Sequence, residues 1–428
     1  MPPSTWRRRA PLACAVAFAA IAALPARADQ FATVVSFSGT DGANPLGALL
    51  DVGGTLYGTT ENGGSANDGT VFSLNPTTGA LATVASFTGT NAAGPYAGLI
   101  DVGGMLYGTT VQGGEALEGT VFSLNPTSGA ITTLATFTGG NGAYPLASLL
   151  DVGGTLYGTT NGGGRANDGT VFSLNPTNGM LTTLVTFTGT NGAYPLSGLL
   201  DVGGTLYGTT GNGGSAHYGT VFSLNPTTER LTTVASFTGG NGDGAYSGLI
   251  DVNGTLYGTT LGGSANDGTV FSLNPTTGAL ATIATFTGAN GAAPYAALTD
   301  VGGTLYGTTG AGGRANDGTV FSLNPTSGVL TTLVTFTGAN GAAPYAGLLD
   351  VNGTLYGTTR GGGTPYDGEV FSVTLPGAAN VPEPASLALL SAGLVGLTLA
   401  RRRPRGEGRI IPMETSFPRE EPAPRAGA

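Results

Sequence analysis

The amino-acid sequence predicts an all-β protein, a seven-bladed β-propeller built from four-stranded repeats of about 50 residues. Three observations lead to this fold class. An Asp-Val pair recurs at residues 51, 101, 151, 201, 251, 300 and 350. The composition, with 77 glycines and only 9% charged residues, favours short strands between glycine turns over helices. The repeat region also begins with the last strand of a repeat and ends one strand short, so its two ends together can complete one repeat.

Each repeat contains four strand-like runs, which in one copy are residues 197–202, 205–210, 219–225 and 231–237. Gly-Gly or Asn-Gly joins the first two strands and predicts a tight hairpin turn with positive φ. Asn-Pro-Thr-Thr-Gly, or a close variant, joins the last two in most copies. The alternative is a β-solenoid, but its coils are shorter and pair in parallel, whereas consecutive hairpins within each copy favour a propeller blade.

The phase of the repeats predicts how the ring closes. Residues 31–37 match the fourth strand of a repeat, and residues 368–373 match the third strand of the last repeat, with no fourth strand after them. Seven complete blades exist only if the first strand joins the last blade. Such a closure also removes the open strand edges that invite aggregation.

The N-terminus has the pattern of a secretory signal. Three arginines at 7–9 precede an apolar stretch at 11–24, and Ala26-Arg27-Ala28 has the small residues of a cleavage site. The single cysteine, Cys14, lies inside that stretch and matches a lipoprotein signal poorly. We therefore expect residues 1–28 to be removed, leaving a chain without thiols or disulfides.

The C-terminus has three features in succession. Val381, Pro382, Glu383 and Pro384 precede an uncharged apolar run at 385–400 and an arginine cluster at 401–405. The run nearly spans a bilayer, and the arginines suit a stop-transfer signal, with a buried helix as the alternative. This combination resembles the PEP-CTERM sorting signal of Gram-negative bacteria. The resemblance implies processing by an exosortase, a membrane-embedded enzyme, and delivery to the cell surface or an extracellular matrix.

The repeats carry a second resemblance. Leu-Tyr-Gly-Thr-Thr, then Gly-Gly, then Gly-Thr-Val-Phe, resembles the GloVer tandem-repeat family of bacterial surface proteins over residues 31–375. This resemblance implies an exported, propeller-like protein and brings no catalytic residues. We expect a signal peptide at 1–28, a propeller at 29–380, a sorting signal with a transmembrane helix at 381–405, and a disordered Pro-rich tail at 406–428.

The charge limits the possible partners. Residues 29–380 hold four arginines and 20 acidic residues, a net charge of −16. A surface of this charge repels phosphate backbones, so nucleic acid is not an expected partner. The charge does not exclude cations, neutral glycans or other surface proteins as partners.

Candidate binding residues lie on one face of the predicted ring. This long-loop face bears the loops between the second and third strands and those that lead from one repeat to the next, whereas the opposite face has tight turns. Acidic residues end the first kind of loop in six copies: Asp68, Glu118, Asp168, Asp267, Asp317 and Asp367. These residues suit Asp-Gly turns ahead of a strand. The alternative is a ring of carboxylates that binds Ca²⁺ as a cofactor.

Tyrosines occur in six of the loops between repeats: Tyr96, Tyr144, Tyr194, Tyr246, Tyr295 and Tyr345. Each could wedge between blades and shield the core. Beside Asn and Asp, they could also form platforms for sugar rings, which have an apolar face and a fringe of hydroxyls. The tyrosines of the Leu-Tyr-Gly-Thr-Thr strands are expected to pack in the core.

The sequence predicts no catalytic residue. His217 is the only histidine, and no acid, base or nucleophile stands out from its equivalents in the other copies. We expect an exported binding or scaffold protein of the surface or matrix, with an exopolysaccharide as the favoured partner. A polysaccharide hydrolase or lyase that uses paired carboxylates is the alternative.

The sorting signal makes a direct prediction. We expect the C-terminal segment to be lost during export, because an exosortase signal is removed when the protein reaches the surface. Intact-mass measurement of the surface protein tests this, and retention of the residues after Arg405 would contradict it.

Overall fold

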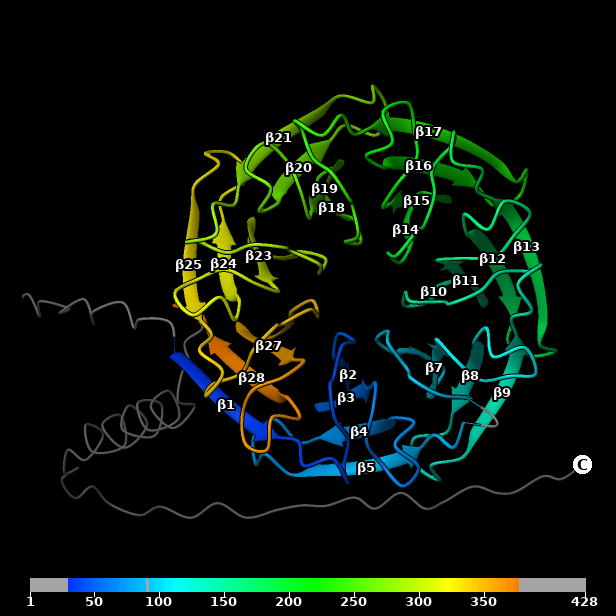
Figure 1. Ribbon diagram of the computed structural model, residues 1–428. Coiled ribbons are helices and arrows are strands. Elements are labelled where there is room, and N and C mark those ends of the chain that lie inside the picture. Colours follow the sequence, from blue (N-terminus) through cyan, green and yellow to red (C-terminus); the bar gives the residue numbers. More distant parts are fainter. Residues whose placement is uncertain (1–29, 90–91, 377–428) are drawn as a thin grey trace, which may run out of the picture. The chain divides into compact units, whose positions relative to one another are not determined.

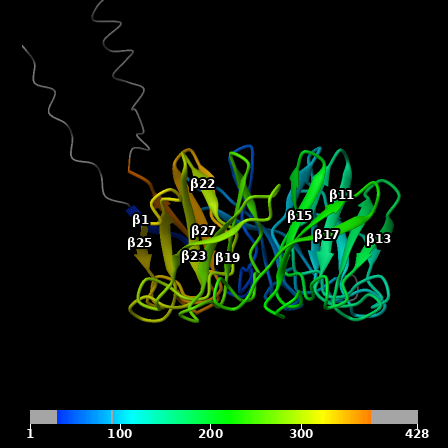
Figure 2. The ribbon, with the colours of Figure 1, turned by 90° about the horizontal axis from the view of Figure 1, so that it is seen from above.

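The computed structural model describes residues 30–89 and 92–376, and this part of the chain is a ring of seven four-stranded antiparallel sheets around an axis (Figure 1). The predicted fold class is confirmed. Blades 1 to 6 follow one another along the chain, and each begins with its innermost strand. Seen along the plane of the ring, the strands run between two faces (Figure 2).

The four positions within a blade are repeated seven times. The innermost strands are β2 (Leu50–Val52), β6 (Ile100–Val102), β10 (Leu150–Val152), β14 (Leu200–Val202), β18 (Ile250–Val252), β22 (Thr299–Val301) and β26 (Leu349–Val351). The second strands are β3 (Thr55–Thr60), β7 (Met105–Thr110), β11 (Thr155–Thr160), β15 (Thr205–Thr210), β19 (Thr255–Thr260), β23 (Thr304–Thr309) and β27 (Thr354–Thr359). The third strands are β4 (Thr70–Leu74), β8 (Thr120–Leu124), β12 (Thr170–Asn175), β16 (Thr220–Asn225), β20 (Thr269–Leu273), β24 (Thr319–Leu323) and β28 (Glu369–Thr374). The outermost strands are β5 (Leu81–Ser86), β9 (Ile131–Thr136), β13 (Met180–Thr186), β17 (Arg230–Ser236), β21 (Leu280–Thr285), β25 (Leu330–Thr335) and, in blade 7, β1 (Gln30–Ser36).

The innermost strand is shorter than the sequence predicts. In the copy predicted to begin at residue 197, the strand starts at Leu200. Residues 197–199 leave the ladder because they are held by the preceding blade, where the Thr159 hydroxyl donates to the carbonyl of Ser197 at 2.9 Å. The other strand ends that the sequence predicted in this copy agree to within one residue.

The tight hairpin turns have the predicted geometry. Asn253 and Gly254 have φ of 54° and 80°, and the Asp251 carboxylate accepts the N–H of Gly254 at 2.8 Å. The same cap occurs in all seven copies, through Asp51, Asp101, Asp151, Asp201, Asp251, Asp300 and Asp350. The Asp of each Asp-Val pair therefore holds its own turn.

Neighbouring blades meet through pairs of phenylalanines. Phe37, which follows β1 in blade 7, meets Phe72 of blade 1 edge to face with ring centroids 5.0 Å apart. Gly58 makes room for this contact, because a Cβ there would lie 2.4 Å from Cζ of Phe72. Seven such pairs join the blades: Phe37–Phe72, Phe87–Phe122, Phe137–Phe172, Phe187–Phe222, Phe237–Phe271, Phe286–Phe321 and Phe336–Phe371.

The rest of the Leu-Tyr-Gly-Thr-Thr strand also serves these contacts. Leu56 is buried in the core cluster shared with the preceding blade, and Tyr57 packs half-buried against the core cluster shared with the next blade, as predicted. The Thr59 hydroxyl donates to the carbonyl of Ala97, on the loop into blade 2, at 2.9 Å. Thr60 shares a hydrogen bond of 2.8 Å with Thr70 of the adjacent strand. Each residue of the motif thus has a structural task.

The ring closes as predicted. β1 pairs antiparallel with β28, from Gln30 opposite Thr374 to Ser36 opposite Glu369, so the N-terminal strand completes blade 7. Phe31 of β1 lies 5.9 Å from Phe336 and 6.0 Å from Phe371, ring centroid to ring centroid. The other six outermost strands carry Leu or Ile at this position, opposite a Leu, whereas Phe31 lies opposite the smaller Val373. The larger Phe31 and the smaller Val373 offset each other, so this pair fills a volume similar to that of the Leu or Ile and Leu pairs of the other blades.

A carboxyl group is buried at the closing strand. Glu369 occupies the position where the other six third strands begin with Thr, and its side chain is 3% exposed. Its carboxylate accepts hydrogen bonds from the hydroxyls of Ser36 at 3.0 Å and Thr33 at 3.3 Å, both on β1. Burial raises the pKa of Glu369 above its usual value, and the two hydrogen bonds oppose that shift only in part.

We expect Glu369→Gln to stabilise the protein at neutral pH. A raised pKa in the folded state means that this carboxyl contributes stability below its unfolded pKa and loses that contribution as the pH rises through the folded pKa. The neutral amide should therefore raise the melting temperature by about 2 °C at pH 7 and have little effect at pH 4. Glu229→Gln, at an exposed turn, removes the same charge as a control. Equal effects of Glu369→Gln at both pH values would contradict this expectation.

We expect deletion of residues 30–36 to lower the melting temperature by about 10 °C or more, because the edge of β28 and the apolar surface under Phe31 become exposed. Since β1 is joined to β28 by no turn, a synthetic peptide of residues 30–37 added to the truncated protein should restore the melting temperature. A scrambled peptide is the control. A harmless deletion would show that the ring does not depend on this strand.

Candidate functional site

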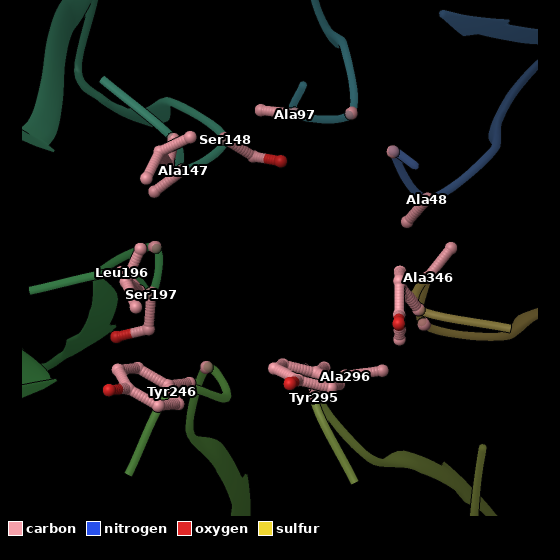
Figure 3. Close-up of a pocket in the computed structure, with 18 of the residues that line it drawn as sticks. Ala48, Ala97, Ala147, Ser148, Leu196, Ser197, Tyr246, Tyr295, Ala296 and Ala346 are labelled. Atoms are coloured by element: carbon pink, nitrogen blue, oxygen red, sulfur yellow. The ribbon is translucent and has the colours of Figure 1, made fainter. Parts of the chain in front are cut away.

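The long-loop face surrounds a cavity on the axis of the ring (Figure 3). Its volume is about 360 Å³, and it is lined by the residues that come immediately before each innermost strand. Six of the seven loops between repeats contain a proline here, which fixes φ and turns the chain toward the axis. Threonines of the preceding blades then hold the backbone after the proline, as Thr59 does for Ala97. The seven loops therefore converge on one site.

The residue after the proline reaches the cavity in each loop. Tyrosine occupies this position in blades 2, 5, 6 and 7, and leucine in blades 1, 3 and 4. We call the first group the inner tyrosines: Tyr96, Tyr246, Tyr295 and Tyr345. The leucines are Leu46, Leu146 and Leu196. Blade 5 has Ala245 in place of the proline and keeps the same geometry, with Tyr246 lining the cavity.

Three inner tyrosines on consecutive blades form a continuous wall. The rings of Tyr246 and Tyr295 are nearly parallel with centroids 6.5 Å apart, and Tyr345 meets Tyr295 edge to face at 4.8 Å. Glycines in the preceding blades admit two of these rings. A Cβ on Gly211 would lie 2.1 Å from Tyr246, and one on Gly310 would lie 2.3 Å from Tyr345.

The hydroxyls of Tyr246 and Tyr295 in this wall stay protonated at neutral pH. Burial raises the pKa of Tyr246 and Tyr295, and the nearby Asp243 carboxylate raises that of Tyr246 further. Burial likewise raises the pKa of Tyr96, with a further rise from Glu61. Tyr96, Tyr246 and Tyr295 thus present neutral hydroxyls that can donate and accept hydrogen bonds.

The other two predicted tyrosines form a separate group, the outer tyrosines, Tyr144 and Tyr194. They come before the proline rather than after it and do not line the cavity. Their side chains are 43% and 39% exposed, and both have φ of 56°. Their N–H groups donate to the carbonyls of Glu118 and Asp168 at 2.8 Å. The order of Tyr and Pro in the sequence separates the two groups: the outer tyrosines precede the proline, whereas the inner tyrosines follow the proline position.

The predicted acidic residues stand one to a blade. Their backbone carbonyls accept an N–H from the loop into the next blade, as Asp68 does from Gly94 at 2.9 Å. Asn67 and Gly69 on either side of Asp68 have φ of 62° and 97°, which is the geometry of a tight turn. Over residues 30–89 and 92–376, no three side chains of Asp, Glu, His or Cys come together in a group that could hold a metal ion.

One pair of charges beside Tyr96 could not be predicted from the sequence. Glu61 of blade 1 and Arg360 of blade 7 follow their second strands and lie 3.9 Å apart, oxygen to nitrogen. They are far apart in the chain, and only closure of the ring makes blades 7 and 1 neighbours. Because both side chains are partly exposed, this ion pair contributes little to stability.

Comparison with known proteins agrees with the repeats described above. The profile of the Gloeobacter/Verrucomicrobia repeat matches residues 19–222 and again residues 199–383. The chain belongs to the Gloeobacter/Verrucomicrobia repeat family. A PEP-CTERM protein-sorting motif also matches residues 380–403, as the sequence predicted. Among curated protein sequences there is no significant match to this member of the family.

The sorting motif lies outside the residues that the structure describes. It implies export, recognition by an exosortase and anchoring in a membrane at the C-terminus. Val381, Pro382, Glu383 and Pro384 fall inside the match. Within the described propeller, no helix has the length and apolar character needed to cross a membrane.

Solved structures share the fold of this repeat protein. An oligogalacturonate lyase from Vibrio parahaemolyticus has a TM-score of 0.53 and 11% identity, over 82% of this chain and 98% of the lyase. An oligogalacturonate lyase in complex with manganese has a TM-score of 0.52 and 11% identity, over 81% of this chain and 93% of the other. At this identity the likeness concerns the fold alone.

Proposed function

We propose that this protein is a surface or matrix protein whose long-loop face binds exopolysaccharide. The observation that carries the proposal is the group of inner tyrosines around the axial cavity. Aromatic rings stack on the apolar face of a sugar, and neutral hydroxyls beside them bond to its fringe. The cavity volume of about 360 Å³ lies within the range of small-molecule sites.

The alternative, a hydrolase or lyase acting on the same polymer, has less support. A glycoside hydrolase needs a pair of carboxylates on either side of the scissile bond. The residues that line the axial cavity are Leu, Gly, Ala, Ser and Tyr, and none carries a carboxylate. A binding or scaffold role uses what the cavity offers, and we propose that role with no cofactor; Ca²⁺ at the acidic loop residues is the remaining alternative.

Delivery fits the same role. We propose that the signal at residues 1–28 starts export, that residues 385–400 hold the chain in the membrane, and that an exosortase then releases it to the surface or matrix. The propeller would there meet exopolysaccharide or other surface proteins.

We expect the triple variant Tyr246→Leu, Tyr295→Leu and Tyr345→Leu to lose polysaccharide binding while keeping its fold, because leucine already occupies this position in blades 1, 3 and 4. Affinity electrophoresis through a gel containing the producing cell's exopolysaccharide would measure the loss. Tyr218→Asp is the control, since Tyr218 lies on the same face and most other blades carry Asp there. Retardation of the triple variant equal to that of the wild type, with equal melting temperatures, would sink the proposal.

A further inference from the structure

The tyrosines of the long-loop face follow a rule along the ring. Each loop that enters blades 2 to 7 carries one tyrosine. It is placed either after the proline position, which is Ala245 in blade 5, in the cavity, or before the proline, on the exposed rim. Blades 3 and 4 carry the outer tyrosines, and their cavity position is taken by Leu146 and Leu196. Blades 3 and 4 lie across the axis from blades 6 and 7 (Figure 1). The aromatic groups therefore change from the cavity to the rim on one side of the ring.

The outer tyrosines occupy a backbone conformation that disfavours them. With φ of 56°, Tyr144 and Tyr194 are bulky residues in the left-handed region. The equivalent residues of the other loops are small or are Asn, the residue that best tolerates this region: Asn44, Gly94, Gly244, Ala293 and Ala343. The turn itself does not need the ring. Strain combined with exposure at a binding face points to a ligand contact.

The cavity favours an uncharged ligand. Its lining residues carry no charged side chain, so an ionic group entering it would lose water without gaining a partner. Beside Tyr96, the charges of Glu61 and Arg360 pair with each other at 3.9 Å. The net charge of −16 over residues 29–380 adds a general repulsion of acidic polymers.

We propose that the cavity holds the uncharged end unit of a polysaccharide chain against Tyr246, Tyr295 and Tyr345, and that the following units leave the site across Tyr144 and Tyr194. The cavity is too small for a long chain to coil inside it, and the outer tyrosines supply exposed rings where such a chain would cross the rim. This inference rests on the proposed polysaccharide-binding function and specifies its ligand as neutral and bound by its end.

Oligosaccharides that differ in chain length and in charge test the inference. Calorimetric titration would use neutral oligosaccharides of glucose, mannose and galactose of two and six units, and oligogalacturonates of the same lengths. Tyr295→Leu should weaken the binding of both neutral lengths about tenfold. Tyr144→Gly with Tyr194→Gly should leave the two-unit affinity unchanged and weaken the six-unit affinity about tenfold. Glycine is the matched replacement because Gly94 and Gly244 hold this position in other loops.

The outcomes separate this inference from the proposed function. Oligogalacturonates should bind at least tenfold more weakly than the neutral sugars. If acidic chains bind as well, or if the double glycine variant weakens both lengths equally, the neutral, end-on mode is wrong while polysaccharide binding stands. If the folded wild-type protein binds none of the sugars and no exopolysaccharide, both proposals fail.

Discussion

The contact on which the ring depends is the phenylalanine pair between neighbouring blades, with a glycine beneath it. Phe72 fills the space left by the missing Cβ of Gly58 and meets Phe37 of the preceding blade. Each core cluster is shared between two blades, as when Val71 of blade 1 packs with Phe122 of blade 2. A single blade therefore has no core of its own, and its apolar faces are buried only when both neighbours are present.

A ring built in this way must close on itself, and the closure concentrates the departures from the repeat. Phe31, Val373 and Glu369 all differ from their counterparts, and all lie where β1 meets β28. Thr358, on β27 of the same blade, is the one threonine of its set whose hydroxyl is buried without a hydrogen-bond partner in the described structure. Six blades follow the repeat, whereas the seventh joins two chain ends and carries side chains particular to it.

The sequence was sufficient for the fold because its signals are local and repeated. Hairpin turns and strand composition act over a few residues, and the same answer recurs seven times. The phase of the first and last strands then predicts how the ring closes. The site was predicted less well. The sequence named six tyrosines of the long-loop face as candidates, and four of them line the axial cavity. Whether a tyrosine such as Tyr144 or Tyr345 enters the cavity depends on whether it stands before or after the proline. The meeting of Glu61 with Arg360 depends on closure of the whole ring.

A binding site with a direction can arise from nearly identical blades because their loops converge on the axis. Positions that are the same in every copy, such as the Asp caps and the Gly-Thr-Thr strands, are accounted for by turns and by contacts between blades. Among the positions that vary are those on the long-loop face that line the cavity, where a change between Tyr and Leu leaves those contacts intact. A choice between Tyr and Leu after each proline is then enough to give the cavity an aromatic side and an aliphatic side. The scaffold depends on residues that recur from blade to blade, whereas the side chains nearest the axis can differ without disturbing it.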